Sequence, residues 1–200
     1  MKRIIFATSN EGKMKEIRSI MKDCGYEIIS LKEAGISVDV EENGTTFEEN
    51  AMIKATTIAK LTKEMVLADD SGLEVDYMEK APGIYSARFL GEHTDYVTKN
   101  SYILEKLAGV PKEERTARFV CVIALAYADG TCITKRATIE GYIGYEIRGE
   151  NGFGYDPIFM VDEYNKTTAE LTMEEKNQIS HRAKALCAIK EELALKGTNE

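Results

Sequence analysis

Two adjacent carboxylates, Asp69 and Asp70, stand near the middle of the chain and are followed by Ser71 and a glycine. The apolar run at residues 65–68 indicates the end of a buried strand. Asp-Asp-Ser-Gly is also typical of a turn between two strands. If the backbone instead stays extended, the two carboxylates point to opposite sides and only one enters a pocket. One or two carboxylates, together with substrate phosphate oxygens, hold a hard cation such as Mg²⁺. A turn and a metal site are therefore both open interpretations of this stretch.

A small polar loop, Thr8-Ser9-Asn10-Glu11-Gly12-Lys13, lies between a predicted strand at residues 3–7 and a predicted helix that Gly25 would end. This order directs backbone N–H groups and a helix N-terminus toward an anion. The pattern is not a Walker A loop. A phosphate-binding loop and an ordinary strand-to-helix turn are equally compatible with it.

A second helix is predicted from the overlapping capping boxes at residues 45–49 to about Leu61. Asn50 and Lys54 lie one turn apart on it and share a face. Glu41 and Glu42 precede this helix. They form a solvated turn unless the loop folds back on Asp70, in which case they join the acidic site.

The glycine-rich stretch at residues 149–157 contains Phe153 between two glycines. It is not a dinucleotide-binding loop, because aromatic residues and a proline follow where a helix should begin. A glycine-flanked ring is poorly placed for a core and well placed to stack on a flat ligand such as a nucleobase. A hairpin with an incidental aromatic residue is the alternative.

The C-terminal part predicts a capped helical turn at residues 170–179 and a longer helix from Ser180 to about Leu195. His181 and Arg182 fall in the first turn of the longer helix, where cations oppose the helix dipole. This cost favours an electronegative partner for them, although a single histidine is more often structural.

The remaining segments predict an α/β fold with a mixed sheet. Strands are expected at residues 27–31 and 73–75, and a helix at 94–107. The apolar run 119–127 indicates a central strand, paired through a turn at 128–131 with residues 131–140. Units of strand and helix at the front and a hairpin at the back give parallel and antiparallel pairs in one sheet.

Composition narrows the class of protein. The chain has 200 residues, 44% of them hydrophobic, which is enough for one domain with a real core. A net charge of −8 argues against a nonspecific binder of nucleic acid polymers, but not against a free nucleotide. The four cysteines form no C-x-x-C pair, and no apolar run suits a signal peptide or a membrane span. We therefore expect a soluble cytoplasmic protein with reduced thiols and no membrane partner.

Six segments together resemble the inosine triphosphatase family of house-cleaning pyrophosphatases, which act on dITP, ITP and XTP. They occur in the family's order and cover nearly the whole chain: Thr8–Lys13, Glu41–Asn50, Ala68–Gly72, Pro82–Arg88, Gly152–Phe159 and Ser180–Arg182. One departure is Ile147, where the family often has proline.

The resemblance implies a single nucleoside triphosphate pyrophosphatase domain over residues 1–200, an elongated mixed β-sheet with flanking helices, and two lobes around a nucleotide-binding cleft. It implies Mg²⁺ as cofactor, held by Glu41 and Asp70, with Asp70 also positioning or deprotonating water, and a homodimer as the assembly. Lys54 would face the phosphates. The expected substrate-binding residues are Thr8, Ser9, Asn10, Glu11, Gly12, Lys13, Ser71, Phe153, Gly154, Tyr155, Asp156, Lys176, His181 and Arg182.

The implied reaction is attack of water on the α-phosphorus with pyrophosphate as leaving group, a step that needs positioning and charge neutralisation. This reaction would remove deaminated purine nucleoside triphosphates from the nucleotide pool. Three alternatives are weighed against it. They are a pyrophosphatase for another nucleotide such as a modified pyrimidine, a nucleotide-binding regulatory module without turnover, and a metal-free carboxylate-pair hydrolase.

Overall fold

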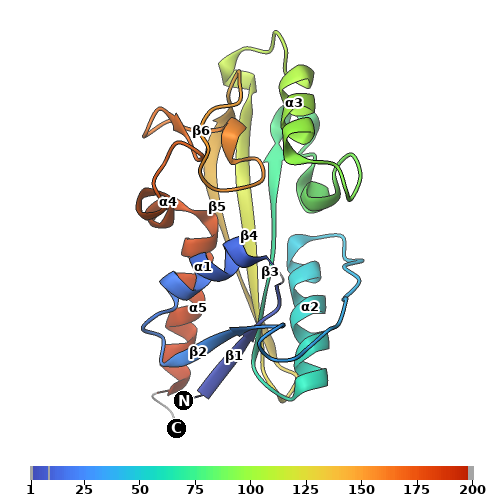
Figure 1. Cartoon of the computed structure of the whole chain (residues 1–200), viewed down its shortest axis with the longest axis vertical. Coiled ribbons are helices and arrows are strands. Elements are labelled where there is room, and N and C mark those ends of the chain that lie inside the picture. The colour runs from blue at the N-terminus through green and yellow to red at the C-terminus, as the bar shows by residue number, and fades with distance from the viewer. Residues whose placement is uncertain (1, 9, 198–200) are drawn as a thin grey trace. The chain divides into compact units, whose positions relative to one another are not determined.

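The structure is a computed structural model that describes residues 2–8 and 10–197 (Figure 1). The helices and strands follow one another in chain order as β1 (Lys2–Phe6), α1 (Glu11–Ile20), β2 (Tyr26–Ser30), α2 (Phe47–Thr62), β3 (Val66–Val75), α3 (Tyr96–Lys106), β4 (Thr116–Ala126), β5 (Cys132–Ile143), β6 (Phe159–Val161), β7 (Lys166–Thr167), α4 (Met173–Ile179) and α5 (His181–Gly197).

The strands form one seven-stranded sheet with the order β2-β1-β3-β4-β5-β6-β7. β1 pairs in parallel with β2 and β3, whereas β6 pairs antiparallel with β5 and β7. β4 and β5 are joined by a short turn in which the Tyr127 N–H donates to the Thr131 carbonyl at 2.8 Å. The predicted α/β class with a mixed sheet and flanking helices is confirmed.

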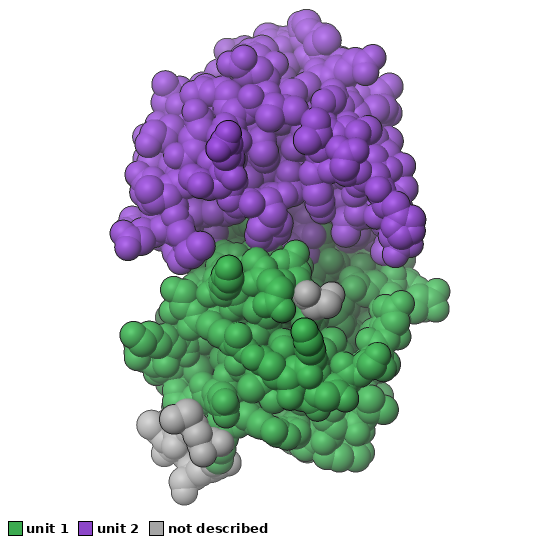
Figure 2. All heavy atoms as spheres, in the orientation of Figure 1, with its two compact units in different colours: residues 1–70, 121–137, 181–200 green, residues 71–120, 138–180 purple. Residues whose placement is uncertain are grey.

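The chain divides into two compact units, coloured separately in Figure 2. Unit 1 comprises residues 1–70, 121–137 and 181–200. In it, α1 and α5 lie on one side of the strands and α2 on the other (Figure 1). The α1 and α5 side has a continuous apolar core, because the buried stripes of both helices meet the inward residues of the strands. Its members include Phe6, Ile17, Leu67, Cys121, Leu186 and Ile189.

Unit 2 comprises residues 71–120 and 138–180 and has a core of its own. α3 contributes Ile103, and the strands contribute Leu73, Val75, Ile143 and Phe159. The prediction that residues 1–200 form a single domain stays a prediction. In the described part of the chain, no helix combines the length and apolar character needed to cross a bilayer.

Local signals predicted most helix boundaries well. Thr46 is the N-cap of α2 and accepts from the Glu49 N–H at 3.1 Å, as the second predicted capping box requires. The Glu49 carboxylate accepts from the Thr45 N–H at 2.6 Å instead of the Thr46 N–H, so this box is formed in its Thr46 half only. α1 ends at Ile20, before Gly25, which instead adopts a φ of +79° in the turn that leads into β2. α3 lies within the predicted helix at 94–107, and its Val97 is 66% exposed although it is apolar.

The turn interpretation of Asp69–Gly72 is wrong. β3 runs without a break from Val66 to Val75, and nearly every residue in it is buried. β1 pairs with β3 at Val66 and Leu67, and β4 is the neighbour of β3 on the other side. Incorporation of the strand into the sheet outweighs the turn preference of Asp-Asp-Ser-Gly.

Candidate functional site

The acidic pair lies where the sheet reverses its winding. β1 is followed by α1 and pairs with β2 on one side, and it pairs in parallel with β3 on the other. Phe6, the last residue of β1, lies opposite Leu67, so Asp69 and Asp70 extend beyond the end of β1. Ligands of open α/β sheets bind at such a switch point, outside the carboxyl ends of the strands.

Asp69 faces a cluster of cations, of which Arg182 is buried and Lys13 and Lys54 are partly buried. Its Oδ2 lies 2.8 Å from Lys13 Nζ and 3.5 Å from Arg182 Nε. Burial disfavours its charge, but Lys13, Arg182 and Lys54 outweigh this and lower the pKa of Asp69. Asp69 is therefore an ionised internal anchor for the cations of unit 1.

Arg182 is itself buried, with 2% of its surface exposed, and its Nη1 donates to Glu16 Oε2 at 2.6 Å. This pair ties α5 to α1. His181, the first residue of α5, is also buried. Arg182 thus has a structural partner that the sequence did not predict, alongside the predicted contact with nucleotide.

Asp70 points to the other side of β3, as an extended backbone requires. Its Oδ2 accepts from Asn50 Nδ2 of α2 at 3.1 Å. Burial, and then the nearby Glu42 carboxylate, raise the pKa of Asp70 to about 7. A carboxyl group with a perturbed pKa at the end of a strand is a candidate for chemistry.

Lys54 brings a cation to the same place. Its Nζ lies 2.7 Å from Glu42 Oε1 and donates to the Asp69 carbonyl at 2.9 Å. Although burial lowers it, the carboxylates of Asp69 and Glu42 raise the pKa of Lys54 overall. Thr8, Glu42 and Lys54 line one cavity of about 220 Å³. Sequence reasoning expected Lys54 to face phosphates, and it lies in a polar cavity beside the acidic pair.

The predicted phosphate loop has the geometry of a helix N-terminus. Asn10 is the N-cap of α1 and accepts from the Lys13 N–H at 3.0 Å, and its own N–H donates to Thr8 Oγ1 at 3.1 Å. Glu11 and Gly12 are exposed in the first turn. The remaining predicted member, Ser9, lies outside the described residues.

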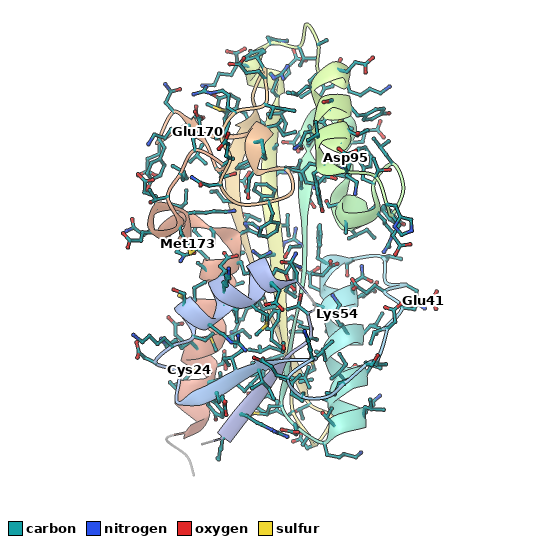
Figure 3. All side chains as sticks on the ribbon, in the orientation of Figure 1. Cys24, Glu41, Lys54, Asp95, Glu170 and Met173 are labelled. Carbon is teal, nitrogen blue, oxygen red and sulfur yellow. The ribbon has the colours of Figure 1, made fainter. Side chains whose placement is uncertain are left out.

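The two glutamates before α2 differ in position. Glu42 is the one beside Asp70 and Lys54. Glu41 is exposed, on the outer side of the loop that precedes α2 (Figure 3). Among residues 2–8 and 10–197, no group of three or more His, Cys, Asp or Glu is arranged to hold a metal ion. The protein thus offers two carboxylates, Glu42 and Asp70, at one place.

The glycine-rich loop of unit 2 is organised by Asp156. Its Oδ2 accepts from the Phe153 N–H at 2.8 Å and pairs with Lys176 Nζ at 2.6 Å, while Oδ1 accepts from Thr168 Oγ1 at 2.8 Å. Lys176 Nζ also lies 5.2 Å from the centre of the Phe153 ring, which is 40% exposed. Unit 2 therefore presents an aromatic ring and a cation side by side.

Gly154 and Tyr155, which follow Phe153, anchor the glycine-rich loop to the rest of unit 2. Tyr155 is buried, and its hydroxyl donates to the Ser86 carbonyl at 2.7 Å. The Gly154 carbonyl accepts from Asn100 Nδ2 at 3.1 Å. Ser71 lies on β3, partly buried, directly after Asp70.

Sequence reasoning missed several partners of the predicted residues. Glu16 and Thr168 carried no signal, because each acts through a contact with a residue distant in the chain. Asn50 did carry a sequence signal, because it shares a helix face with Lys54.

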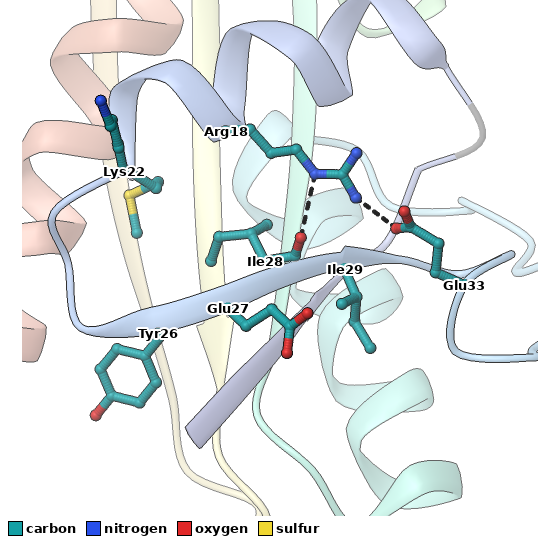
Figure 4. A pocket seen from close by; sticks show the side chains of 8 residues that line it. Arg18, Lys22, Tyr26, Glu27, Ile28, Ile29 and Glu33 are labelled. Atoms are coloured by element: carbon teal, nitrogen blue, oxygen red, sulfur yellow. Dashed lines mark hydrogen bonds and ion pairs between the residues drawn. The ribbon is translucent and has the colours of Figure 1, made fainter. Parts of the chain in front are cut away.

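A second surface cavity of about 330 Å³ lies between α1 and β2 (Figure 4). There Arg18 Nε donates to the Ile28 carbonyl at 3.2 Å and Arg18 Nη2 pairs with Glu33 at 2.5 Å. None of the predicted site residues lines it.

Known proteins resemble this chain in sequence and in fold. A dITP/XTP pyrophosphatase of Desulforamulus reducens is 52% identical over 92% of this chain and 92% of its own length. A dITP/XTP pyrophosphatase of Bacillus subtilis is 50% identical over 93% and 94%. The solved structure of the Staphylococcus aureus Ham1 protein matches with a TM-score of 0.88 and 42% identity, covering 98% of this chain and 100% of that one. The model of the Ham1 family matches residues 4–192, and the chain belongs to that family.

Proposed function

We propose that this protein hydrolyses dITP, ITP and XTP to the monophosphate and pyrophosphate, and so keeps deaminated purines out of DNA and RNA. Relatives at about half identity carry the name dITP/XTP pyrophosphatase. The observation that carries the proposal is the surroundings of Asp70, a buried carboxyl group of raised pKa with Glu42 and Lys54 beside it. Phosphoryl chemistry needs this combination of a carboxylate that orients water and cations that face phosphates.

We propose Mg²⁺ as the cofactor. The donor set suits it, because Mg²⁺ takes one or two protein carboxylates and completes its shell with phosphate oxygens and water. Asp70 and Glu42 are two carboxylates whose mutual repulsion a divalent cation would relieve. Glu41 remains the ligand that the family resemblance predicts. When bound, Mg²⁺ neutralises phosphate charge and makes a coordinated water more acidic.

The chain's own residues then divide the work on the phosphates. Asp70 orients the attacking water or takes its proton, and Lys13 and Lys54 offset the charge of the phosphate oxygens. The N-terminus of α1, capped by Asn10, supplies backbone N–H groups to the same anion. Water bonds to the α-phosphorus, the bond from that phosphorus to the bridging oxygen breaks, and pyrophosphate leaves with the electron pair.

Base recognition follows from hydrogen-bond polarity. Hypoxanthine and xanthine carry a 6-oxo acceptor where adenine carries an amino donor. Donors from His181, Arg182, Lys176 or the backbone around Gly154 would pair with the oxo group and be left unsatisfied by adenine. Sites of this kind discriminate by about 10⁴–10⁵-fold. Phe153 would stack on the base, and Asp156 and Tyr155 hold the loop that presents it.

Product analysis tests the proposal. The purified protein is incubated with dITP, XTP, dATP, dGTP and dUTP, with and without Mg²⁺. Monophosphate and pyrophosphate from dITP and XTP, dependent on Mg²⁺ and nearly absent with dATP and dGTP, are expected. Orthophosphate would mean attack at the γ-phosphorus and would contradict the mechanism. Turnover of dUTP alone would favour the pyrimidine alternative, and tight binding without turnover would favour a regulatory module.

We also propose that the protein is a cytoplasmic homodimer, as the family resemblance implies. Where the structure describes the chain, Cys24, Cys121, Cys132 and Cys187 form no disulfide, which suits a reducing compartment. Light scattering coupled to size-exclusion chromatography tests the dimer, and a mass corresponding to one chain would contradict it. Fractionation of the source cells tests the location.

A further inference from the structure

Asn50 is a buried polar side chain for which the reaction described above has no role. It lies in the first turns of α2 with 1% of its surface exposed. Its Nδ2 donates to Asp70 Oδ2 at 3.1 Å, and its Oδ1 accepts from the Gly44 N–H at 2.8 Å. One amide therefore touches both the central carboxylate and the loop before α2.

The orientation of this amide is fixed by chemistry. A backbone N–H only donates, so the Asn50 oxygen must face Gly44 and the nitrogen must face Asp70. The nitrogen then holds one oxygen of Asp70 and leaves the other carboxylate oxygen for metal or water. A carboxylate held by a fixed donor on a rigid helix has one preferred rotamer, which is what a residue that positions water needs.

Gly44 is the other half of the arrangement. A Cβ at this position would lie 2.7 Å from Asn50 Oδ1 and 2.7 Å from Glu49 Cβ. Only glycine lets the backbone approach the amide this closely. The loop held in this way carries Glu42, whose carboxylate pairs with Lys54 at 2.7 Å. Asn50 thus links the segment that bears Glu42 to the strand that bears Asp70.

We propose that Asn50 is a positioning residue, which fixes the Asp70 carboxylate and holds the loop at residues 41–44 so that Glu42 and Asp70 face the same cation. The expected effect of Asn50 on turnover rests on the proposed function. Its link between Asp70 and the loop at residues 41–44 rests on the two hydrogen bonds alone.

Two substitutions of Asn50 distinguish its hydrogen bond to Asp70 from its hydrogen bond to Gly44. Asn50→Asp keeps an acceptor for the Gly44 N–H and replaces the donor to Asp70 by a second carboxylate. Asn50→Leu has a similar volume and loses both hydrogen bonds. Asn165→Asp is the control, because it makes the same change at an exposed asparagine outside this loop.

Steady-state kinetics with dITP at saturating Mg²⁺ give the first measurement. For Asn50→Asp and Asn50→Leu we expect kcat to fall about 10²-fold with KM changed by less than about threefold, because misplacement of a catalytic group affects turnover more than binding. Asn165→Asp is expected to match the parent protein. If kcat of both Asn50 variants stays within threefold of the parent, or KM rises as much as kcat falls, the positioning role is overturned.

Two further measurements do not depend on turnover. Amide hydrogen exchange at Gly44 should stay slow in Asn50→Asp and become at least about tenfold faster in Asn50→Leu. Calorimetric titration with Mn²⁺ should show about tenfold weaker binding in Asn50→Leu, which loses the donor to Asp70 without adding a charge. Unchanged exchange and unchanged Mn²⁺ affinity would overturn the inference. A parent protein without activity on dITP would refute the proposed function, whereas these two measurements would still decide the role of Asn50. If Asn50→Asp fails to fold, Asn50→Leu decides by all three measurements.

Discussion

Asp69 and Asp70 are consecutive residues of β3, yet their carboxylates face opposite sides of the sheet and have opposite pKa shifts. Asp69 is ion-paired with Lys13 at 2.8 Å, and the surrounding cations lower its pKa. Asp70 is hydrogen-bonded to Asn50, and burial raises its pKa to about 7. The period of two of an extended strand therefore separates a structural carboxylate from a chemical one. The first three predictions below follow from this difference.

Replacing Asp70 by Asn should abolish turnover and spare the fold. The amide cannot accept a proton from water and is a poor ligand for Mg²⁺, so we expect kcat/KM for dITP to fall on the order of 10³-fold or more. Circular dichroism should remain that of the parent. Asp162→Asn, at an exposed partner of Lys112, is the control and should retain full activity. Near-normal activity of Asp70→Asn would refute the assigned role.

Asp70 should also make stability depend on pH in the metal-free protein. Its pKa is raised on folding, from an ordinary value near 4 to about 7, so the folded state binds the proton more tightly. Its contribution to stability is complete below about pH 4 and is lost as the pH rises through 7. The unfolding free energy of the parent relative to Asp70→Asn should therefore fall by on the order of 2 kcal/mol between pH 5 and pH 8.

Urea denaturation of both proteins at the two pH values measures this difference. Because Mg²⁺ binds the ionised carboxylates, it should raise Tm of the parent more at pH 8 than at pH 5. Asp70→Asn should show a smaller rise. A parent-to-variant difference that is constant between pH 5 and pH 8 would contradict the raised pKa.

Replacing Asp69 by Asn should destabilise the protein even though the shape of the side chain is kept. The substitution removes the fully buried carboxylate that pairs with the partly buried Lys13, and it leaves the buried Arg182 with Glu16 alone. Breaking one side of a buried ion pair costs about 3–5 kcal/mol. The unfolding free energy from urea denaturation measures the loss. Glu64→Gln is the control, because it removes the carboxylate of the Arg3–Glu64 ion pair, which is more exposed than Asp69. This change should cost about 0–1 kcal/mol. Equal losses in the two variants would mean that Asp69 is not the anchor we describe.

Local sequence signals predicted the parts of this fold that depend on neighbours in the chain. The capping threonine Thr46 is one such part, and the helix predicted from Ser180 to about Leu195 is another. In the structure this helix is α5, and it buries Leu186, Ile189 and Leu193 at helical spacing. Asp69–Gly72 was ambiguous, because its turn preference gives way to pairing with strands that are distant in sequence.

The sequence supplied the candidate residues of the site, but it could not predict which of them contact one another. Arg182 and Glu16 are 166 positions apart in the chain, so no local pattern could join them. The choice between Glu41 and Glu42 depends on how the loop before α2 folds onto Lys54, which also lies outside any periodic signal.

Phe153→Ala should raise KM for dITP while leaving stability nearly unchanged. The ring is 40% exposed, so little apolar burial is lost, but stacking of a base on an aromatic ring contributes about 1–3 kcal/mol. We therefore expect KM to rise at least about fivefold. Tyr77→Ala, at another exposed aromatic residue of unit 2, is the control and should leave KM unchanged. An unchanged KM in Phe153→Ala would place the base elsewhere.

Gly152→Ala should disrupt the loop that presents Phe153 by a steric route. Gly152 has a φ of +75°, and a Cβ there would lie 2.2 Å from Asp156 Oδ2. Asp156 Oδ2 now accepts a hydrogen bond from the Phe153 N–H at 2.8 Å. Asp156 must move away from this N–H, so the hydrogen bond that holds the backbone of Phe153 is lost. Gly130→Ala is the matched control, because Gly130 has a φ of +91° and no atom within 4 Å of the added Cβ. Both variants should lose about 1–3 kcal/mol of unfolding free energy from backbone strain, measured by urea denaturation. Only Gly152→Ala should also raise KM for dITP, and by at least as much as Phe153→Ala does. An equal KM in the two glycine variants would show that Asp156 does not control the position of Phe153.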